Sequence, residues 1–261
     1  MWDSAGMYDR DVRQRALALI DEGMSVRAVY KCTGISRATL RDWRDHPEKT
    51  GQRASCPRCA VPPRLPEPLR DYAYLLGLYL GDGCISSGGD PAKGVWALRI
   101  ACADAWPGLI EECKMAMRAT RPGNKVGTRQ CVGCTEVTAY SRHWPCLFPQ
   151  HGPGKKHNRA IELAPWQQVI VGQRPGDFAR GLFHSDGCRF TSRVRRPLPG
   201  GDRWYEYPRY MFTNESRDIL GLCGQALDEL GVSWRFSRRN TISVARREAV
   251  ARLDEFVGPK F

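Results

Sequence analysis

One short segment occurs twice in the sequence, and this repetition constrains the fold more than any other feature. Residues 74–83 read YLLGLYLGDG and residues 178–187 read FARGLFHSDG. Each segment has the apolar spacing of a helix, small residues at positions i and i+4, and an acid followed by glycine at its end. Small residues four apart lie on one face of a helix, which lets two such helices approach backbone to backbone. We therefore predict that the two copies pack against each other. The predicted contact residues are Gly77, Gly81, Gly181 and Ser185.

Both predicted helices end on an aspartate, Asp82 or Asp186, and the glycine after each is expected to adopt the left-handed cap conformation. A carboxylate there lies at the negative end of the helix macrodipole. If the helices pair in parallel, the two carboxylates converge and repel each other by roughly 3 kcal/mol at about 5 Å and an effective dielectric near 20. A divalent cation removes that repulsion, and Mg²⁺ prefers carboxylate and carbonyl oxygens. We predict a Mg²⁺ or similar site formed by both aspartates and the backbone carbonyls of Gly81 and Ser185, able to support phosphodiester cleavage.

The residues that follow the two motifs repeat one order of elements. A short strand comes first, then a longer strand, VWALRIACAD (95–104) or RWYEYPRYMFT (203–213), then an amphipathic helix, two further strands and a last helix. Each half therefore reads αββαββα, and Asp82 and Asp186 lie 104 residues apart. Two tandem copies of one topology predict a pseudo-symmetric pair, with repeats at 70–164 and 165–261.

The N-terminal residues 1–46 predict a separate all-helical domain. Ser25 and Ser36 are placed as N-caps on either side of the turn Thr33-Gly34-Ile35, which gives the order helix, glycine-containing turn, helix. The stretch SVRAVYKCTGISRATLRDW (25–43) resembles the helix-turn-helix of resolvases, transposases and bacterial regulators. In that interpretation the third helix enters the major groove of DNA. The alternative is an ordinary three-helix module with a solvated basic face. The candidate DNA-binding residues of this helix are Ser36, Arg37, Thr39, Arg41 and Arg44.

Residues 47–69 hold six prolines and little apolar periodicity, which is typical of a linker. Within them, Cys56 and Cys59 have the spacing of half a zinc site. Cys131 and Cys134 have the same spacing and could supply the other two ligands. The alternative is that these are four ordinary thiols.

Overall composition favours a nucleic-acid partner. The 261 residues carry a formal net charge of +12, with a pI near 9.4, and such basic chains most often bind nucleic acid, although ribosomal and membrane-surface proteins are also basic. The 11 cysteines are odd in number and scattered, which fits a reducing compartment. The N-terminus lacks the apolar stretch of a signal peptide, and the longest apolar run is about ten residues, too short to span a membrane. We expect a monomer in the bacterial cytosol or nucleoid.

The two motifs resemble those of the LAGLIDADG homing endonucleases, in the single-chain form with two tandem copies. LLGLYLGDG (75–83) and ARGLFHSDG (179–187) match the nine-residue signature, and the resemblance extends over residues 70–261. It implies an α+β fold in which two four-stranded antiparallel sheets form a saddle over double-stranded DNA. It also implies that Asp82 and Asp186, at the acidic position of each motif, bind metal and cleave both strands across the minor groove.

The resemblance also suggests further site residues. Members of the family often place a lysine near the metal, late in each repeat. The first repeat offers Lys155 or Lys156, whereas the second offers Arg246 or Arg247 and, on this interpretation, no lysine, so that one half would be catalytically weaker. Arginines of the predicted strands are candidate DNA contacts, with solvated surface charge as the alternative. These arginines are Arg99, Arg189, Arg193, Arg195 and Arg209.

Three functions are compatible with these features. The first is a metal-dependent, site-specific DNA endonuclease whose helix-turn-helix adds specificity. The second is a transcriptional regulator that uses the scaffold without cleavage, similar to actinobacterial regulators that combine the two modules. The third is an intron maturase, which a major-groove helix suits poorly because A-form RNA has a narrow major groove. The two converging acids favour the nuclease, and the helix-turn-helix favours the regulator.

Overall fold

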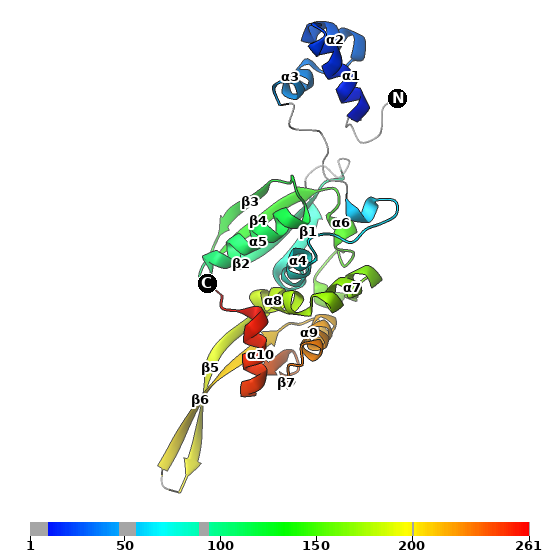
Figure 1. Cartoon of the computed structure of the whole chain (residues 1–261). Coiled ribbons are helices and arrows are strands. Elements are labelled where there is room, and N and C mark those ends of the chain that lie inside the picture. The colour runs from blue at the N-terminus through cyan, green and yellow to red at the C-terminus, as the bar shows by residue number, and fades with distance from the viewer. Residues whose placement is uncertain (1–9, 47–55, 89–93, 200, 261) are drawn as a thin grey trace. The chain divides into compact units, whose positions relative to one another are not determined.

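The computed structural model describes residues 10–46, 56–88, 94–199 and 201–260 (Figure 1). The chain divides into two compact units, Met1–Ser55 and Cys56–Phe261. The larger unit therefore begins at Cys56, within the segment that the sequence suggested as a linker. The buried side chain of Cys56 joins the core of this unit, which explains why the segment does not extend freely to residue 69.

The smaller unit is a three-helix module with a helix-turn-helix. Its helices are α1 (Arg10–Asp21), α2 (Val26–Thr33) and α3 (Arg37–Asp45). The Ser25 hydroxyl accepts a hydrogen bond from the Ala28 N–H, which begins α2. Gly34 ends this helix at φ 72°, a conformation that favours glycine, and its N–H donates to the Tyr30 carbonyl. The core of the unit consists of Ala16, Val29, Ile35 and Leu40.

The larger unit contains the predicted αββαββα order twice. The first repeat comprises α4 (Leu69–Asp82), β1 (Gly83–Ser87), β2 (Trp96–Ala103), α5 (Pro107–Thr120), β3 (Val126–Cys131), β4 (Cys134–Ser141) and α6 (Trp144–Leu147). The second comprises α8 (Pro175–Asp186), β5 (Gly187–Leu198), β6 (Gly201–Thr213), α9 (Arg217–Glu229), β7 (Arg235–Arg238), β8 (Thr241–Val244) and α10 (Arg247–Val257). An additional helix, α7 (Pro165–Gln173), precedes the second motif, and short 3₁₀ turns η1 (Pro57–Cys59) and η3 (Lys156–Asn158) lie in the connections.

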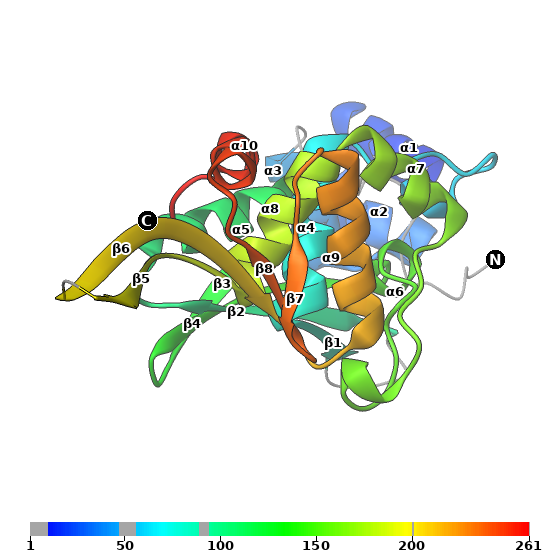
Figure 2. The ribbon, with the colours of Figure 1, turned by 90° about the horizontal axis from the view of Figure 1, so that it is seen from below.

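The two sheets have the same strand order, β1-β2-β4-β3 and β5-β6-β8-β7, and every pair is antiparallel. This topology confirms the predicted α+β fold. Figure 2 shows strands β1 to β4 of the first sheet along the lower side and helices α4, α5 and α8 above them. Because side chains alternate along a strand, each sheet buries one face against the helices and leaves the other facing outward. In β2 the alternating residues Leu98, Ile100 and Cys102 belong to the hydrophobic core, and this one core runs through both repeats.

The two motif helices, α4 and α8, lie against each other along the small residues of the repeated segment. A Cβ atom added to Gly77 would lie 2.5 Å from the Phe178 carbonyl oxygen. One added to Gly181 would overlap the Tyr74 carbonyl, and one added to Gly81 would overlap the Ser185 side chain. The contact is therefore backbone to backbone, and no larger side chain fits.

The glycines that follow the motif acids have a different role from the one that the sequence suggested. Gly83 and Gly187 are extended, with φ values of −92° and −102°, so the predicted left-handed cap is wrong. A Cβ atom at either position would lie 2.6 Å from the Cα atom of Tyr79 or Phe183 in the preceding turn. Glycine is needed here because the chain turns directly from the helix into the first strand.

Candidate active site and nucleic-acid interface

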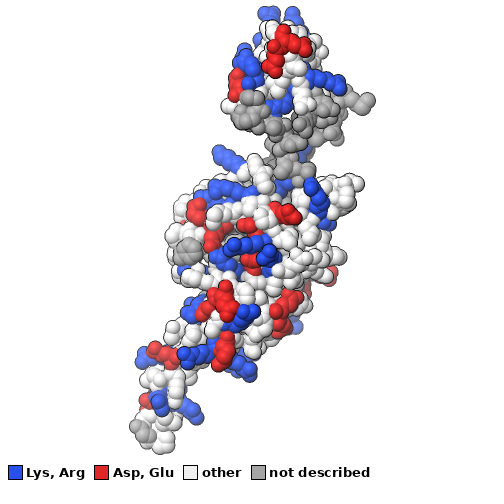
Figure 3. All heavy atoms as spheres, in the orientation of Figure 1, with Lys and Arg blue, Asp and Glu red and all other residues white. Residues whose placement is uncertain are grey.

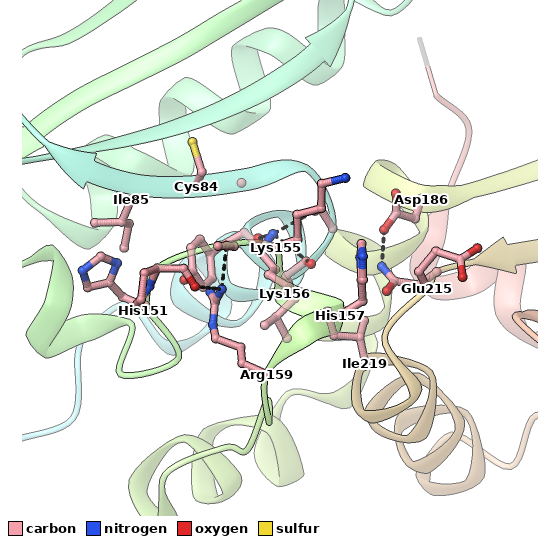
Figure 4. A pocket seen from close by; sticks show the side chains of 18 of the residues that line it. Cys84, Ile85, His151, Lys155, Lys156, His157, Arg159, Asp186, Glu215 and Ile219 are labelled. Carbon is pink, nitrogen blue, oxygen red and sulfur yellow. Dashed lines mark hydrogen bonds between the residues drawn. The ribbon is translucent and has the colours of Figure 1, made fainter.

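A pocket of about 870 Å³ lies where α4 and α8 end. Its lining comes from the last turn of α4, from β1, from the connection 151–159, and from Asp186, Asn214 and Glu215 of the second repeat. Figure 4 shows Lys156, His157, Asp186 and Glu215 around this space. Both repeats therefore contribute to one pocket.

Asp186 lies close enough to Asp82 to affect its protonation. Asp82 is exposed on one side, but the protein around its carboxylate removes part of its hydration. This desolvation, together with the neighbouring Asp186 carboxylate, raises the pKa of Asp82 to about 6, although Lys156 and Lys260 act to lower it. Burial also raises the pKa of Asp186, whereas a hydrogen bond from Asn214 and the charge of Lys156 act to lower it. The Asn214 Nδ2 group donates to the Asp186 carboxylate at 2.6 Å, so the second aspartate is held in position.

A lysine binds the carbonyl end of each motif helix. The Lys156 Nζ atom donates to the backbone carbonyl of Tyr79, to that of Leu80 at 3.0 Å and to that of Gly81 at 2.9 Å. Desolvation lowers the pKa of Lys156 to about 8, although both aspartates raise it. An ammonium group here neutralises the negative end of the α4 dipole.

The second repeat has an equivalent lysine, which the sequence interpretation missed. The Lys260 Nζ atom donates to the Gly187 carbonyl at 2.6 Å and to the Ser185 carbonyl at 3.4 Å. The expectation that this repeat has no lysine is therefore wrong. Arg246 and Arg247 instead lie at the beginning of α10, as its N-cap and first residue. Lys260 lies 104 residues after Lys156, the same offset as between Asp82 and Asp186, and this offset was the signal that could have identified it.

The residues at the helix ends fit a hard divalent cation. The structure brings together two carboxylates of raised pKa, and the carbonyl oxygens of Gly81 and Ser185 lie beside them, each accepting a hydrogen bond from a lysine ammonium. Oxygen donors of these two kinds are what Mg²⁺ and Ca²⁺ bind. Lys155, by contrast, is exposed at the pocket rim, so Lys156 is the lysine that reaches the helix end.

On the outward face of the first sheet, Arg99 lies among polar partners. Its guanidinium donates to Ser86 of β1 and lies 3.6 Å from the Glu136 carboxylate of β4. Arg129 of β3 binds the same carboxylate at 3.3 Å. In the second sheet, Arg209 occupies the outward face next to Tyr207, and its buried Nε atom has no hydrogen-bond partner among the described residues. Arg99, Arg129 and Arg209 therefore lie on the outward faces of the two sheets.

Three of the predicted DNA contacts lie on the opposite face of their strand. Arg189 forms a bidentate pair with Asp254 of α10, at 2.8 and 2.9 Å. Arg193 and Arg195 share this face by strand alternation and pair with acids of β6, namely Glu206 and Asp202. The sequence interpretation counted strand arginines without assigning them to a face, so it included these three. The arginines of the outward face in β5 and β6 are Arg196, Arg203 and Arg209.

β5 and β6 form a long hairpin that extends beyond the helices (Figure 1). Its side chains mix cations, acids and aromatic rings: Arg193 lies over the Trp204 ring at 4.4 Å, and Arg203 lies over Tyr205 at 5.6 Å. Figure 3 shows basic and acidic groups side by side along this hairpin. Exposed aromatic rings next to arginines are suited to contacts with nucleic acid.

In the smaller unit, two of the five candidate residues are engaged in capping. The Ser36 hydroxyl accepts from the Thr39 N–H at 3.1 Å and contacts the Thr39 hydroxyl at 2.7 Å. Arg37, Arg41 and Arg44 are exposed on α3. Arg44 forms a local ion pair with Asp45 at 2.9 Å. The helix therefore offers a row of three guanidinium groups at helical spacing.

The two cysteine pairs of equal spacing do not lie in one group of metal ligands among the described residues. Cys131 and Cys134 face each other across the β3–β4 turn, whereas Cys56 and Cys59 lie with His143 and Cys146. Their identical spacing left open whether the two pairs meet. The connection after β4 instead brings His143 and Cys146 to Cys56 and Cys59.

A buried polar network lies between the motif helices and the C-terminal end of α10. The His184 ring is 3.0 Å from the Tyr74 hydroxyl through Nδ1 and 3.0 Å from the Val257 carbonyl through Nε2. Glu112 accepts hydrogen bonds from Tyr74 and Arg180. Burial, together with the Arg180 charge, lowers the pKa of His184 to about 4, so the ring is neutral near pH 7 and serves in packing.

Comparison with known proteins gives matches for both units. A family described as the homeodomain-like domain matches residues 7–55. Among solved structures, mesophilic variants of the homing endonuclease I-DmoI show 15% identity over 72% of this chain and 96% of that chain, with a TM-score of 0.45. The LAGLIDADG meganuclease I-AabMI, bound to uncleaved DNA, shows 12% identity over 71% and 82%, with a TM-score of 0.45. The meganuclease I-SmaMI, bound to uncleavable DNA, shows 11% identity over 73% and 85%, with a TM-score of 0.43.

No curated protein matches the chain. Within the described residues, none of the helices has the length and apolar character needed to cross a membrane.

Proposed function

We propose that the protein is a site-specific endonuclease of double-stranded DNA that depends on a divalent cation. One observation carries this proposal: Asp82 and Asp186 end two helices in direct backbone contact, and each helix end holds a lysine. A scaffold that only binds DNA gains nothing from two converging carboxylates, because they repel both each other and the phosphates. A paired set of acids and lysines suits a reaction on two strands.

The residues of the two repeats would act in parallel. Asp82 and Asp186, with the carbonyls of Gly81 and Ser185, would hold Mg²⁺ or another divalent cation, which when bound lowers the pKa of water and stabilises the leaving oxygen. Lys156 and Lys260 would lie beside the scissile phosphates. With a pKa near 8, the Lys156 Nζ atom exchanges its proton close to neutral pH and so can transfer one between a reacting group and solvent.

The outward faces of the two sheets would bind the duplex, one sheet for each half of the target. Arg99, Arg129 and Arg209 would contact phosphates and bases there. The smaller unit would add a second reading element, with Arg37 and Arg41 of α3 in the major groove. The protein would act as a monomer in a reducing cytosol or nucleoid, since one chain already contains both halves and its cysteines are free.

The test is selection of bound sequences from random DNA, followed by incubation of the selected duplex with Mg²⁺ or Mn²⁺. We expect the wild type to cut both strands, and Asp82→Asn and Asp186→Asn to bind the same duplex without cutting it. Cleavage by either variant at the wild-type rate would refute the assignment of the aspartates.

The alternative is a DNA-binding regulator that does not cleave. The lysine ammonium groups favour it, because they bind the helix-end carbonyls and offset the two carboxylates without any metal. In that case the selected duplex stays intact with every divalent cation, and Asp82→Asn binds it more tightly because a repulsive charge is gone. The nuclease predicts instead that Ca²⁺ strengthens binding by the wild type and has no such effect on Asp82→Asn.

A further inference from the structure

A second group of metal ligands lies apart from the motif aspartates, where the chain enters the larger unit. The ligand atoms of Cys56, Cys59, His143 and Cys146 all lie within 4.8 Å of one another. The Cys59 sulfur is 3.5 Å from His143 Nδ1 and 3.6 Å from the Cys146 sulfur. These four residues come from two segments more than 80 positions apart, 56–59 and 143–146.

The separations match a tetrahedral zinc site. With zinc–sulfur bonds of about 2.3 Å and zinc–nitrogen bonds of about 2.1 Å, tetrahedral ligands lie about 3.8 Å apart for two sulfurs and about 3.6 Å apart for sulfur and nitrogen. A disulfide between Cys59 and Cys146 would instead require about 2.0 Å. Three sulfurs and one imidazole are a common ligand set of structural zinc.

The backbone around Cys56 is arranged as in a metal-binding turn. The 3₁₀ turn η1 closes between the two cysteines, since the Cys59 N–H donates to the Cys56 carbonyl at 2.9 Å. Both ligand pairs have two residues between their members, since His143 and Cys146 repeat the interval of Cys56 and Cys59.

The surroundings suit the charge of such a site. Three thiolates and a neutral imidazole around Zn²⁺ leave a net charge of −1. The Arg121 side chain is only 3% exposed, it interacts electrostatically with both Cys59 and His143, and its Nε atom has no hydrogen-bond partner among the described residues. A buried guanidinium without a full set of partners is costly unless an anionic group lies near it.

The segment that carries Cys56 and Cys59 has little else to hold it. Residues 60–64 are exposed or half-buried, and Val61 is fully exposed. Among its described residues, Arg58 adds a contact in which its guanidinium lies 4.5 Å from the Trp166 ring centroid. We infer that Cys56, Cys59, His143 and Cys146 form a structural zinc site that fastens the entry of the larger unit to α6 of the first repeat. This site is independent of the proposed nuclease activity.

The test is the metal content and thermal unfolding of the purified full-length chain. We expect about one zinc per chain by elemental analysis, and Co²⁺ exchanged into the wild type should give the absorption bands of tetrahedral thiolate coordination. Cys59→Ser and Cys146→Ser should each lose the zinc. The matched control is Cys131→Ser/Cys134→Ser, which removes the other pair of the same spacing and should keep it. Asp82→Asn/Asp186→Asn should also keep it, since those residues belong to a different site.

Zinc-free wild type after metal loading, or loss of zinc from the cysteine control, would overturn the inference. So would a Cys59–Cys146 disulfide detected by mass spectrometry in protein prepared under reducing conditions. If the Cys59 and Cys146 variants do not fold, chelation of the wild-type protein tests the inference instead. A strong chelator should release one zinc and lower the melting temperature, and added zinc should restore it. Chelation that leaves the melting temperature unchanged would contradict a structural role.

Discussion

Lys156 and Lys260 bind carbonyl oxygens at the ends of two different helices, α4 and α8, and the sequence separates them by the same interval that separates Asp82 and Asp186. The two halves therefore present matching sets of one acid and one lysine. Each lysine is expected to serve one strand of DNA.

Replacing one lysine should turn double-strand cleavage into nicking. We expect Lys156→Met to slow cleavage of one strand by about 100-fold, the lower end of what proton-transfer residues contribute, while the other strand is cut normally. Lys260→Met should affect the other strand. Strand-specific labels on the selected duplex measure both rates. Lys155→Met is the control, because this exposed neighbour should leave both rates unchanged; equal slowing of both strands by Lys156→Met would refute the division of labour.

A methyl group at the helix contact should be strongly destabilising. Gly181→Ala places a Cβ atom against the Tyr74 carbonyl, and backbone cannot move aside as a side chain can. We expect a loss of about 3 kcal/mol in the free energy of unfolding, at the upper end of overpacking effects. Gly221→Ala is the matched control: this glycine is also inside a helix, but a Cβ atom there meets open space, so the substitution should be neutral or stabilising by up to about 1 kcal/mol. Urea unfolding of the two variants compares them directly.

The Asp82 carboxylate should destabilise the metal-free protein above pH 6. Its pKa is about 6 in the folded state, above the ordinary value of 3.8, so between these values the folded chain binds more protons and stability falls as pH rises. Asp82→Asn removes this penalty. We expect a gain of about 1 kcal/mol at pH 7.5 in EDTA, reduced by solvent screening, and none near pH 4. In saturating Ca²⁺ the wild type should instead be more stable than the variant. Asp21→Asn, at an exposed position, should show neither effect.

The His184 ring should have the opposite pH dependence. Its folded pKa is about 4, below the ordinary 6.5, so the unfolded chain binds more protons between these values and stability is lost as pH falls. We expect roughly 3 kcal/mol of loss from this residue between pH 6.5 and 4. His184→Gln should flatten that part of the stability profile, whereas His157→Gln, on an exposed turn, should not. Identical profiles for the wild type and His184→Gln would show that the ring does not resist protonation.

Removal of the smaller unit should weaken the salt dependence of DNA binding. Each phosphate contact contributes about −0.9 to the slope of log K against log salt. Loss of Arg37, Arg41 and Arg44 by deletion of residues 1–55 should therefore reduce the slope by about 2 to 3. Arg41→Ala alone should reduce it by about 1. Fluorescence anisotropy between 50 and 200 mM salt measures this, and an unchanged slope after the deletion would mean that this unit does not touch DNA.

The sequence was sufficient to predict the repeat topology and the helix contact, because both depend on local patterns. Glycine spacing places Gly77 and Gly181 on one face whatever surrounds them, and the order of elements follows from periodicity. The tertiary structure decides the rest. Strand register turns Arg189 towards Asp254, and the fold groups Cys56 with His143 and Cys146, neither of which a local pattern reveals. Lys260 lies after the last predicted helix, where no periodicity marks it, and only comparison of the two halves at a fixed offset would have found it.

The second strands of the two sheets differ in length. β6 has 13 residues and β2 has 8, and at about 3.3 Å per residue this difference amounts to about 17 Å, or roughly five base pairs of B-form DNA. A duplex lying along both sheets would contact a longer strand at one end than at the other. Its recognition sequence should therefore be asymmetric rather than palindromic, and the protein should bind it in one orientation only.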